Sequence, residues 1–290
     1  MKPVTIALRQ IAVFAFLACA TLSIATGGHQ SAAGDIKLSA KARVEMVYVP
    51  SGGFTMGGVD IRPGETLDNI SGGIGSSIKR VSPGGYRISP NNEGPQRTVY
   101  LDGYWIGKNL VTVAQFREFT QVTHYRYNWK ANRPEWGFID SHPMVFVSWE
   151  DARAFCKWAG GDLPTEAQWE KAARGTDGRE YPWGNNWDPN RLWSGHSHEP
   201  APIGSFPSGA SPYGCLDMVG NTWQYCLDWF GQSYDNLPSS NPTGVAEGQE
   251  RVIRGGFFDG LAYTAFRCAY RSATDPKCGS CAMGFRMASQ

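Results

Sequence analysis

Short runs of alternating apolar and polar residues dominate the first half of the chain. Residues 44–50 (VEMVYVP) and 98–106 (TVYLDGYWI) place apolar side chains at every second position, which predicts two strands. Between them, glycine pairs at 52–53 and 57–58 flank FTM, for which we expect a tight, hairpin-like turn. Residues 60–95 are rich in glycine, serine and proline and show no period, so we expect a long loop there.

Three stretches carry the longer period of amphipathic helices. Thr112 is a favoured N-cap residue, and the apolar residues after it share one face as far as residue 120. Residues 149–160 repeat this spacing until two glycines end it, and Thr165 with Gln168 forms the capping box of a third helix. Beyond residue 181 the sequence breaks into short apolar pieces between turn signals, without a linker that would divide it.

The composition favours a single compact α+β domain that is poor in regular structure. Glycine (35) and proline (18) are abundant among the 290 residues, which argues for many turns and against a helical bundle. With 41% hydrophobic and 13% aromatic residues, the chain is too apolar for a disordered protein. The 27 basic and 26 acidic residues nearly cancel and form no evident basic face, so we expect no nucleic-acid partner.

The N-terminus has the features of an export signal. Two basic residues precede an apolar run at 11–24, which is short for a membrane span and ends at small residues. We therefore predict a signal peptide at 1–25, a loose polar lead-in at 26–43 and a folded domain at 44–290, in a periplasmic or secreted protein. The alternatives are an uncleaved anchor and a lipid on Cys19, and we expect no other contact with a membrane.

Six cysteines follow the predicted signal peptide, an even number that indicates disulfides in an oxidising compartment. They are Cys156, Cys215, Cys226, Cys268, Cys278 and Cys281, and the sequence does not select among their pairings. The last two form a C-x-x-C pair. Such a pair can be a reactive disulfide, a two-thiolate site for a soft metal such as Cu(I), or a structural disulfide that closes a turn.

A second candidate site lies in the segment 217–224 (DMVGNTWQ). Asp217 and Gln224 carry side-chain oxygens, and a turn that contains glycine can direct backbone carbonyls inward. Oxygen ligands of this kind suit a hard cation such as Ca²⁺, and the alternative is an ordinary turn.

Several motifs, in their order and spacing, closely resemble those of the formylglycine-generating enzyme (sulfatase-modifying factor) superfamily. They are PMVFVSWEDARAFCKWAGGDLPTEAQWEKAARG at 143–175, LDMVGNTWQ at 216–224, RVIRGG at 251–256 and GFR at 284–286. The resemblance starts near Met46 and extends to the C-terminus. It implies one compact domain, a variant of the C-type-lectin-like fold with little regular secondary structure.

Enzymes of that superfamily use O₂ and a copper ion held by two cysteines to oxidise a cysteine of a sulfatase to formylglycine. The stretch that resembles their copper site, 257–268, contains no cysteine before Cys268. Two polar residues of the family's cleft are replaced, by Phe257 and Ala282, whereas its tryptophan is present as Trp223. The resemblance therefore implies a cleft without the copper pair, lined by Trp223, Phe257, Phe258, Asp259 and the loop 278–281.

The resemblance also bears on calcium and on disulfides. It matches a calcium site to the side chain of Asp217, the carbonyls of Gly220 and Thr222, and Gln224, where the family usually has glutamate. The family's partners of Cys156 and Cys268 fall on Met287 and Ala173, which implies that these two cysteines are free or pair differently.

From these features we expect an exported, oxidase-like maturation factor that acts as a monomer on a peptide or protein substrate in a shallow cleft. It would be an O₂-dependent oxidoreductase that does not use the family's two-cysteine copper route, with Cys278 and Cys281 as candidate catalytic residues. One alternative is a non-catalytic module that binds a peptide or protein in the same cleft. Another is a true formylglycine-generating oxidase whose copper ion is held by Cys278 and Cys281.

Overall fold

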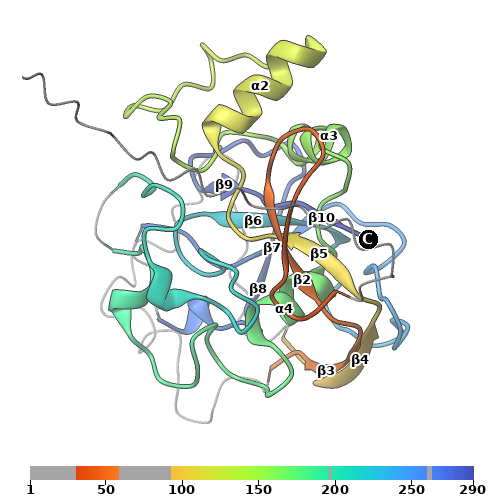
Figure 1. The fold of residues 1–290 in the computed structure, drawn as a ribbon. Helices are drawn as coiled ribbons and strands as arrows, with labels where there is room; N and C mark the ends of the chain where they lie inside the picture. Colours follow the sequence, from red (N-terminus) through yellow and green to blue (C-terminus); the bar gives the residue numbers. More distant parts are fainter. Residues whose placement is uncertain (1–30, 59–92, 196–197, 260–262) are drawn as a thin grey trace, which may run out of the picture. The chain divides into compact units, whose positions relative to one another are not determined.

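The computed structural model describes residues 31–58, 93–195, 198–259 and 263–290 (Figure 1). The predicted signal peptide and nearly all of the loop predicted at 60–95 lie outside these residues. Within the described part of the chain, no helix is long and apolar enough to cross a membrane.

A four-stranded antiparallel sheet joins the first strands of the domain to its last residues. Its order is β1 (Ile36–Leu38), β2 (Glu45–Val49), β5 (Tyr104–Gly107) and β10 (Ala288–Ser289). β2 confirms the strand predicted at 44–50. All three residues of β1 pair with β2, and Ala42 between them is buried, so residues 31–43 belong to the domain and are not a loose lead-in. β1 is only three residues long, too short for alternation to predict it, and its apolar residues Ile36 and Leu38 are exposed.

β3 (Gly52–Met56) and β4 (Arg97–Leu101) form a separate antiparallel pair. The segment expected to be a hairpin-like turn is therefore a strand, whose partner lies far along the chain. The single strand predicted at 98–106 is divided between β4 and β5, which belong to different sheets. At the division, a Cβ on Gly103 would come within 2.1 Å of the Tyr48 hydroxyl, so a larger residue there would require the Tyr48 side chain to move.

The third sheet contains parts of three of the sequence motifs, those at 216–224, 251–256 and 284–286. Its order is β8 (Arg271–Thr274), β7 (Arg251–Arg254), β6 (Trp223–Trp229) and β9 (Met283–Gly284), with β6 and β9 parallel and the other neighbours antiparallel. All of β8 and most of β6 and β7 are buried, so this sheet lies inside the domain. Polar side chains on such a sheet need partners within the protein.

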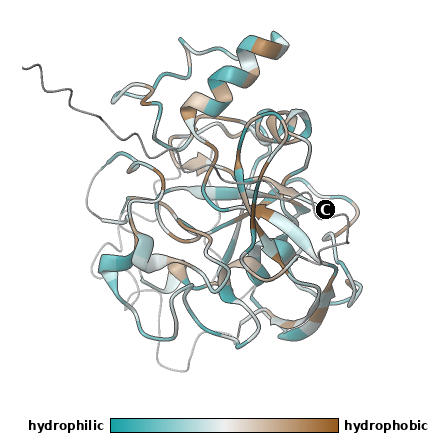
Figure 2. Ribbon diagram, viewed as in Figure 1, coloured by the Kyte–Doolittle hydropathy of each residue, from teal (hydrophilic) through white to brown (hydrophobic). Residues whose placement is uncertain are grey.

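The three predicted helices are confirmed, each with a capping box. They are α2 (Val113–Thr123), α3 (Trp149–Trp158) and α4 (Glu166–Arg174), which begin after Thr112, Ser148 and Thr165. Short 3₁₀ helices follow at η1 (Pro189–Arg191), η2 (Pro207–Gly209) and η3 (Tyr263–Phe266). α2 stands at the upper edge of the view in Figure 1, and hydrophobic and hydrophilic bands alternate along it in Figure 2.

The six described cysteines carry thiols, and none forms a disulfide. Cys156, Cys215, Cys226 and Cys268 are fully buried, and burial raises the pKa of each of these thiols. The expectation of disulfides is therefore corrected: these four cysteines act as small apolar residues of the core.

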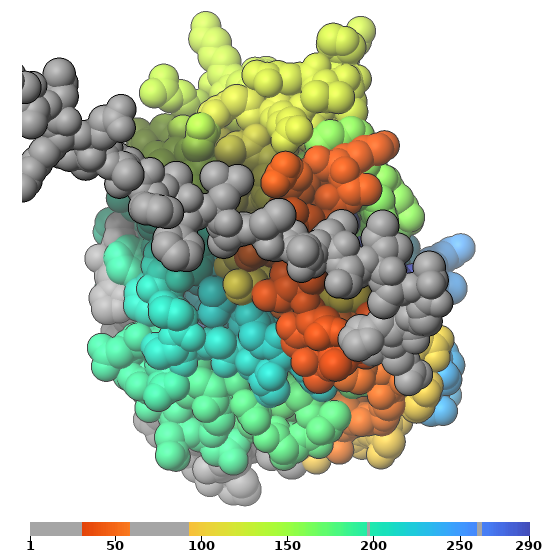
Figure 3. All heavy atoms as spheres, viewed as in Figure 1, coloured from red at the N-terminus to blue at the C-terminus, as the bar shows by residue number. Residues whose placement is uncertain are grey.

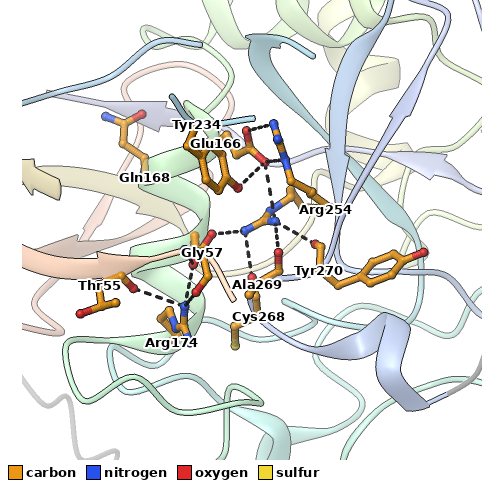
Figure 4. Close-up of polar contacts among 12 residues, drawn as sticks. Thr55, Gly57, Glu166, Gln168, Arg174, Tyr234, Arg254, Cys268, Ala269 and Tyr270 are labelled. Atoms are coloured by element: carbon orange, nitrogen blue, oxygen red, sulfur yellow. Dashed lines mark hydrogen bonds and ion pairs between the residues drawn. The ribbon is translucent and has the colours of Figure 1, made fainter. Parts of the chain in front are cut away.

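Two carboxylates of α4 hold the arginines of the buried sheet (Figure 4). Glu166 accepts two hydrogen bonds from Arg271, with Nε–Oε1 and Nη2–Oε2 distances of 2.8 and 2.7 Å. Glu170 pairs with Arg254 through one oxygen and with Arg174 through the other, the latter at 2.8 Å. These five side chains are at most 6% exposed, so each of them has a partner of opposite charge inside the domain.

Asp228 on β6 lies beside this group of charges. Its Oδ2 accepts a hydrogen bond from the backbone N–H of Glu166 at 2.8 Å. Burial, reinforced by the negative charge of Glu166, raises the pKa of Asp228 to about 7. The carboxyl therefore changes its charge near neutral pH.

The raised pKa of Asp228 makes the stability of the domain depend on pH. Between about pH 4 and 7 the folded protein keeps the proton that the unfolded chain has released, so the free energy of unfolding falls as the pH rises. Asp228→Asn retains an acceptor oxygen and does not titrate. In urea unfolding we expect this variant to gain on the order of 3 kcal/mol relative to the wild type between these two pH values.

The control for this experiment is Asp235→Asn, which changes an exposed carboxylate and should follow the wild-type curve. Parallel curves of stability against pH for the wild type and Asp228→Asn would mean that the buried carboxyl does not hold its proton.

Candidate functional site

Three segments meet where the resemblance places the family's cleft. Trp223 begins β6, Phe257 and Phe258 follow β7, and the loop 275–282 connects β8 to β9. Because β6 lies between β7 and β9, the sheet brings the three segments together. The N–H of Trp223 donates to the carbonyl of Ala282 at 2.8 Å and so fixes the start of β6 against the loop.

The aromatic residues predicted to line the cleft are core residues. Trp223 is fully buried, and Phe258 and Phe257 are only 2% and 8% exposed. The ring of Trp223 stacks with those of Phe257 and Tyr270 at centroid distances of 6.5 and 6.2 Å. These rings fill the interior where the resemblance implies a cleft, instead of forming its exposed walls.

Two cavities of about 620 and 760 Å³ lie in other parts of the described chain. The first borders Lys37 and the residues of β10, and the second borders Tyr181, Trp187 and Arg267. None of the predicted site residues lines either cavity.

The loop 275–282 holds the two candidate catalytic cysteines against the aromatic residues. It is tied to the chain before α3, since the N–H of Phe146 donates to the carbonyl of Ser280 at 3.0 Å. Cys278 is 6% exposed, whereas Cys281 is half-buried, so Cys281 is the thiol that solvent reaches more readily. Burial raises the pKa of Cys281, which favours the protonated thiol at neutral pH.

Asp259 and Trp136 lie at the outer edge of the same site. After burial, the negative charge of Asp259 is a further cause of the raised pKa of Cys281. Oδ1 of Asp259 also lies 3.5 Å from Nδ1 of His198. Trp136 packs edge-to-face on Phe258, with ring centroids 6.1 Å apart. We call Cys281, Asp259 and Trp136 the thiol face.

Gln224, predicted as a calcium ligand, is the centre of a buried polar cluster. Its Oε1 accepts from Nε1 of Trp169 at 2.8 Å and from Nε of Arg286 at 2.6 Å. Its Nε2 donates to the carbonyls of Asp217 and Met218, at 2.9 Å each. Arg286 also donates to the Asp217 carbonyl at 3.0 Å. Both ends of the amide are therefore engaged by the protein, and a guanidinium supplies the positive charge.

The other three predicted calcium ligands lie next to this cluster. Oδ2 of the buried Asp217 accepts from the N–H of Gly204 at 2.7 Å, and burial raises the pKa of this carboxyl. Gly220 donates its N–H to the carbonyl of Gly255 at 2.8 Å. Oγ1 of Thr222 is buried and has no hydrogen-bond partner among the described residues. Across all residues that the structure describes, no group of three or more His, Cys, Asp or Glu side chains could hold a metal ion.

Trp169 and Arg286 are the members of this cluster that the sequence analysis did not single out. Both lie in segments that carry the resemblance, but their partner Gln224 is far along the chain from Trp169 and Arg286 alike. The sequence did contain a sign of this cluster: glutamine in place of the family's glutamate removes a negative charge from the segment 217–224. An amide is suited to bridge a guanidinium and backbone carbonyls, since it both accepts and donates.

Comparison with known proteins identifies the family. The family model of the sulfatase-modifying factor enzyme 1-like domain matches residues 32–290. The chain is 30% identical to a formylglycine-generating enzyme of Thermomonospora curvata, over 84% of this chain and 92% of the relative. It is 39% identical to an inactive C-alpha-formylglycine-generating enzyme 2 of Bos taurus, over 51% of this chain and 50% of the relative.

Among solved structures, that of PvdO from Pseudomonas aeruginosa has a similar fold. Its TM-score is 0.71 at 21% sequence identity, over 89% of this chain and 99% of that one. The similarity confirms the predicted single α+β domain with few helices. By its family match and its relatives, the chain belongs to the sulfatase-modifying factor (formylglycine-generating enzyme) family, as the motifs implied.

Proposed function

We propose that the protein is an exported maturation factor that binds a peptide or protein substrate at the thiol face and oxidises it with O₂. The proposal rests on the position of the C-x-x-C loop, whose half-buried Cys281 packs on the buried aromatic cluster. Membership of the family supports a peptide or protein as the substrate. The apolar run at 11–24 supports export to the periplasm or the medium.

The core cluster on which Cys281 packs also carries aromatic residues that suit a peptide. Trp136, Phe138 and Trp193 are half-buried and pack on the same core cluster, so each offers part of a ring to the surface. Aromatic side chains are common anchors at protein interfaces. A substrate side chain placed on this surface would meet Cys281 before any other thiol of the loop.

The family's copper ion fits the described residues poorly. Two thiolates would hold a cuprous ion, but Phe257 and its neighbours provide none at the family's position. The remaining pair is Cys278, which is nearly inaccessible, and Cys281, whose raised pKa opposes loss of its proton. We therefore assign no step to copper: the substrate is the electron donor, O₂ is the acceptor, and Cys281 is the thiol that contacts the substrate.

A non-catalytic binding module is the second candidate. It is favoured by the ring of Phe257, which stacks on Trp223 where the resemblance implies an open cleft. It is also favoured by the bovine relative, whose name describes an inactive enzyme. In this case the thiol face would hold a substrate without turnover.

Replacing the two thiols separates these candidates. The probes are an array of cysteine-containing peptides and the same peptides with serine in place of cysteine. For peptides that bind, we expect Cys281→Ala and Cys278→Ala to lower O₂ uptake at least ~10-fold while affinity changes less than ~3-fold. An oxygen electrode reports turnover, and fluorescence anisotropy reports binding.

Cys215→Ala, at a buried thiol of the other core cluster, is the control and should keep the wild-type turnover. Binding by the wild type without O₂ uptake would identify a binding module. Uptake that requires both thiols and added copper would instead support an oxidase with a copper ion held by Cys278 and Cys281.

The Gln224 cluster predicts a fold that does not depend on calcium. Because Arg286 already donates to the Asp217 carbonyl, we expect calcium or a chelator to shift the Tm of the wild type by less than ~1 °C. Gln224→Ala leaves Nε1 of Trp169 and Nε of Arg286 without their acceptor, which should cost about 2 to 4 kcal/mol of unfolding free energy.

Gln121→Ala, at an exposed glutamine on α2, is the matched control and should leave stability within about 0.5 kcal/mol of the wild type. A Tm that rises with calcium would show that an ion joins Asp217 in spite of the hydrogen bonds of Gln224.

A further inference from the structure

We propose that residues 124–138, which we call the basic–aromatic segment, bind carboxylates of the substrate, so that the substrate is an acidic peptide segment. The inference rests on the proposed function for the place where the substrate binds, but not on the oxidation. Figure 3 shows the chain around residues 113–140 (yellow-green) as a raised surface at the top of the view, from which several side chains project.

The basic–aromatic segment carries a local excess of positive charge. Its fully charged side chains are Arg126, Lys130, Arg133 and Glu135, all of them exposed. None of the three cations lies within ion-pair distance of a carboxylate in the described chain. Nearby cations are neutralised: Arg117 pairs with Asp140. The excess charge is therefore available to a partner that brings carboxylates.

Aromatic rings lie between these cations. Trp129 contacts Tyr127 and Phe138 edge-to-face, at centroid distances of 5.0 and 4.8 Å. All three rings are half-buried and pack on the core cluster beneath them. The surface thus combines apolar area with positive charge, a combination that suits a peptide with both apolar and acidic side chains.

The backbone of the segment is held in place by the rest of the domain. Oη of Tyr125 donates to Oδ1 of Asp151 on α3 at 2.9 Å, and Oη of Tyr127 donates to the carbonyl of Phe146 at 3.1 Å. Within the segment, Asn128 accepts from the N–H groups of Ala131 and Asn132. A surface that is already ordered loses less conformational entropy when a peptide binds.

The same contacts connect the segment to the thiol face. Phe146, which accepts from Tyr127, donates its own N–H to the carbonyl of Ser280 in the C-x-x-C loop. Trp136, a member of both the segment and the thiol face, packs on Phe258. A peptide that reaches Cys281 would therefore extend over the basic–aromatic segment.

An acidic peptide fits this surface better than a nucleic acid does. Three exposed cations, partly offset by Glu135, are few for a phosphate backbone, which proteins contact with longer basic stretches. The chain as a whole has a formal net charge of only +1. The aromatic rings are half-buried and pack edge-to-face on one another, so they do not form an open stacking platform for bases.

Two peptides of opposite charge test the proposal. Each has a central cysteine beside a leucine, flanked by glutamates in one peptide and by lysines in the other. We expect the wild type to bind the glutamate peptide at least ~10-fold more tightly at low ionic strength, with a difference that shrinks as salt is added. The triple variant Arg126→Glu/Lys130→Glu/Arg133→Glu should reverse this preference.

The control is Lys41→Glu/Lys157→Glu, which changes two exposed cations outside the segment and should keep the preference for the glutamate peptide. Arg126→Gln/Lys130→Gln/Arg133→Gln should abolish the preference without reversing it, and circular dichroism verifies that each variant is folded. Equal affinity of the wild type for both peptides overturns the proposal. So does tighter binding of a single-stranded oligonucleotide that matches the charge of the glutamate peptide.

The outcome is independent of the oxidation. A charge preference in a wild-type protein that binds the peptides but consumes no O₂ supports the basic–aromatic segment and refutes the oxidase. Turnover of both peptides without a charge preference supports the oxidase and refutes the basic–aromatic segment as the binding site.

Discussion

The charges of α4 determine how the interior of the domain is built. Glu166 and Glu170 neutralise Arg271 and Arg254, which lie on two neighbouring strands of the buried sheet (Figure 4). Loss of one member would leave a charge without a partner in the core, at a cost of about 3 to 5 kcal/mol. Arg254 also donates to the carbonyls of residues 268, 269 and 270, so the same ion pairs fix the chain before β8. The position of the loop that follows β8, which carries the two thiols, depends on this arrangement.

A further buried cation, Arg286, organises the start of β6. Arg286 and Gln224 together satisfy backbone carbonyls of residues 216–218, where the resemblance implies a calcium ion. The Arg286 guanidinium supplies a positive charge at this place. Gln224 follows Trp223 in β6, so the hydrogen bonds of Gln224 also hold the backbone of residues 216–218 close to the start of this strand.

The sequence predicted the helices well because their signals are local. Each N-cap and its partner are three residues apart, and each capping box is present in the structure. The sequence predicts strands less well because their partners are distant. The pattern predicts a turn where β3 lies and a single strand where β4 and β5 lie. It also found the aromatic residues of the site, but not their burial, which depends on three segments that meet only in the folded chain. The sequence did not predict the hydrogen bonds around Arg286 for the same reason, because Trp169, Gln224 and Arg286 meet only in the folded chain.

The arrangement of the site constrains how a thiol could act there. The resemblance implies that the family's copper cysteines fall within the stretch 257–268, whereas here the more accessible sulfur lies on the loop 275–282. Burial and Asp259 both raise the pKa of Cys281, so a second carboxylate close to the sulfur would oppose thiolate formation further. Cations on the basic–aromatic segment, away from the sulfur itself, allow an acidic substrate to bind while its charge is neutralised by arginine and lysine. The distribution of charge along the site therefore separates the part that holds a substrate from the part that could react with it.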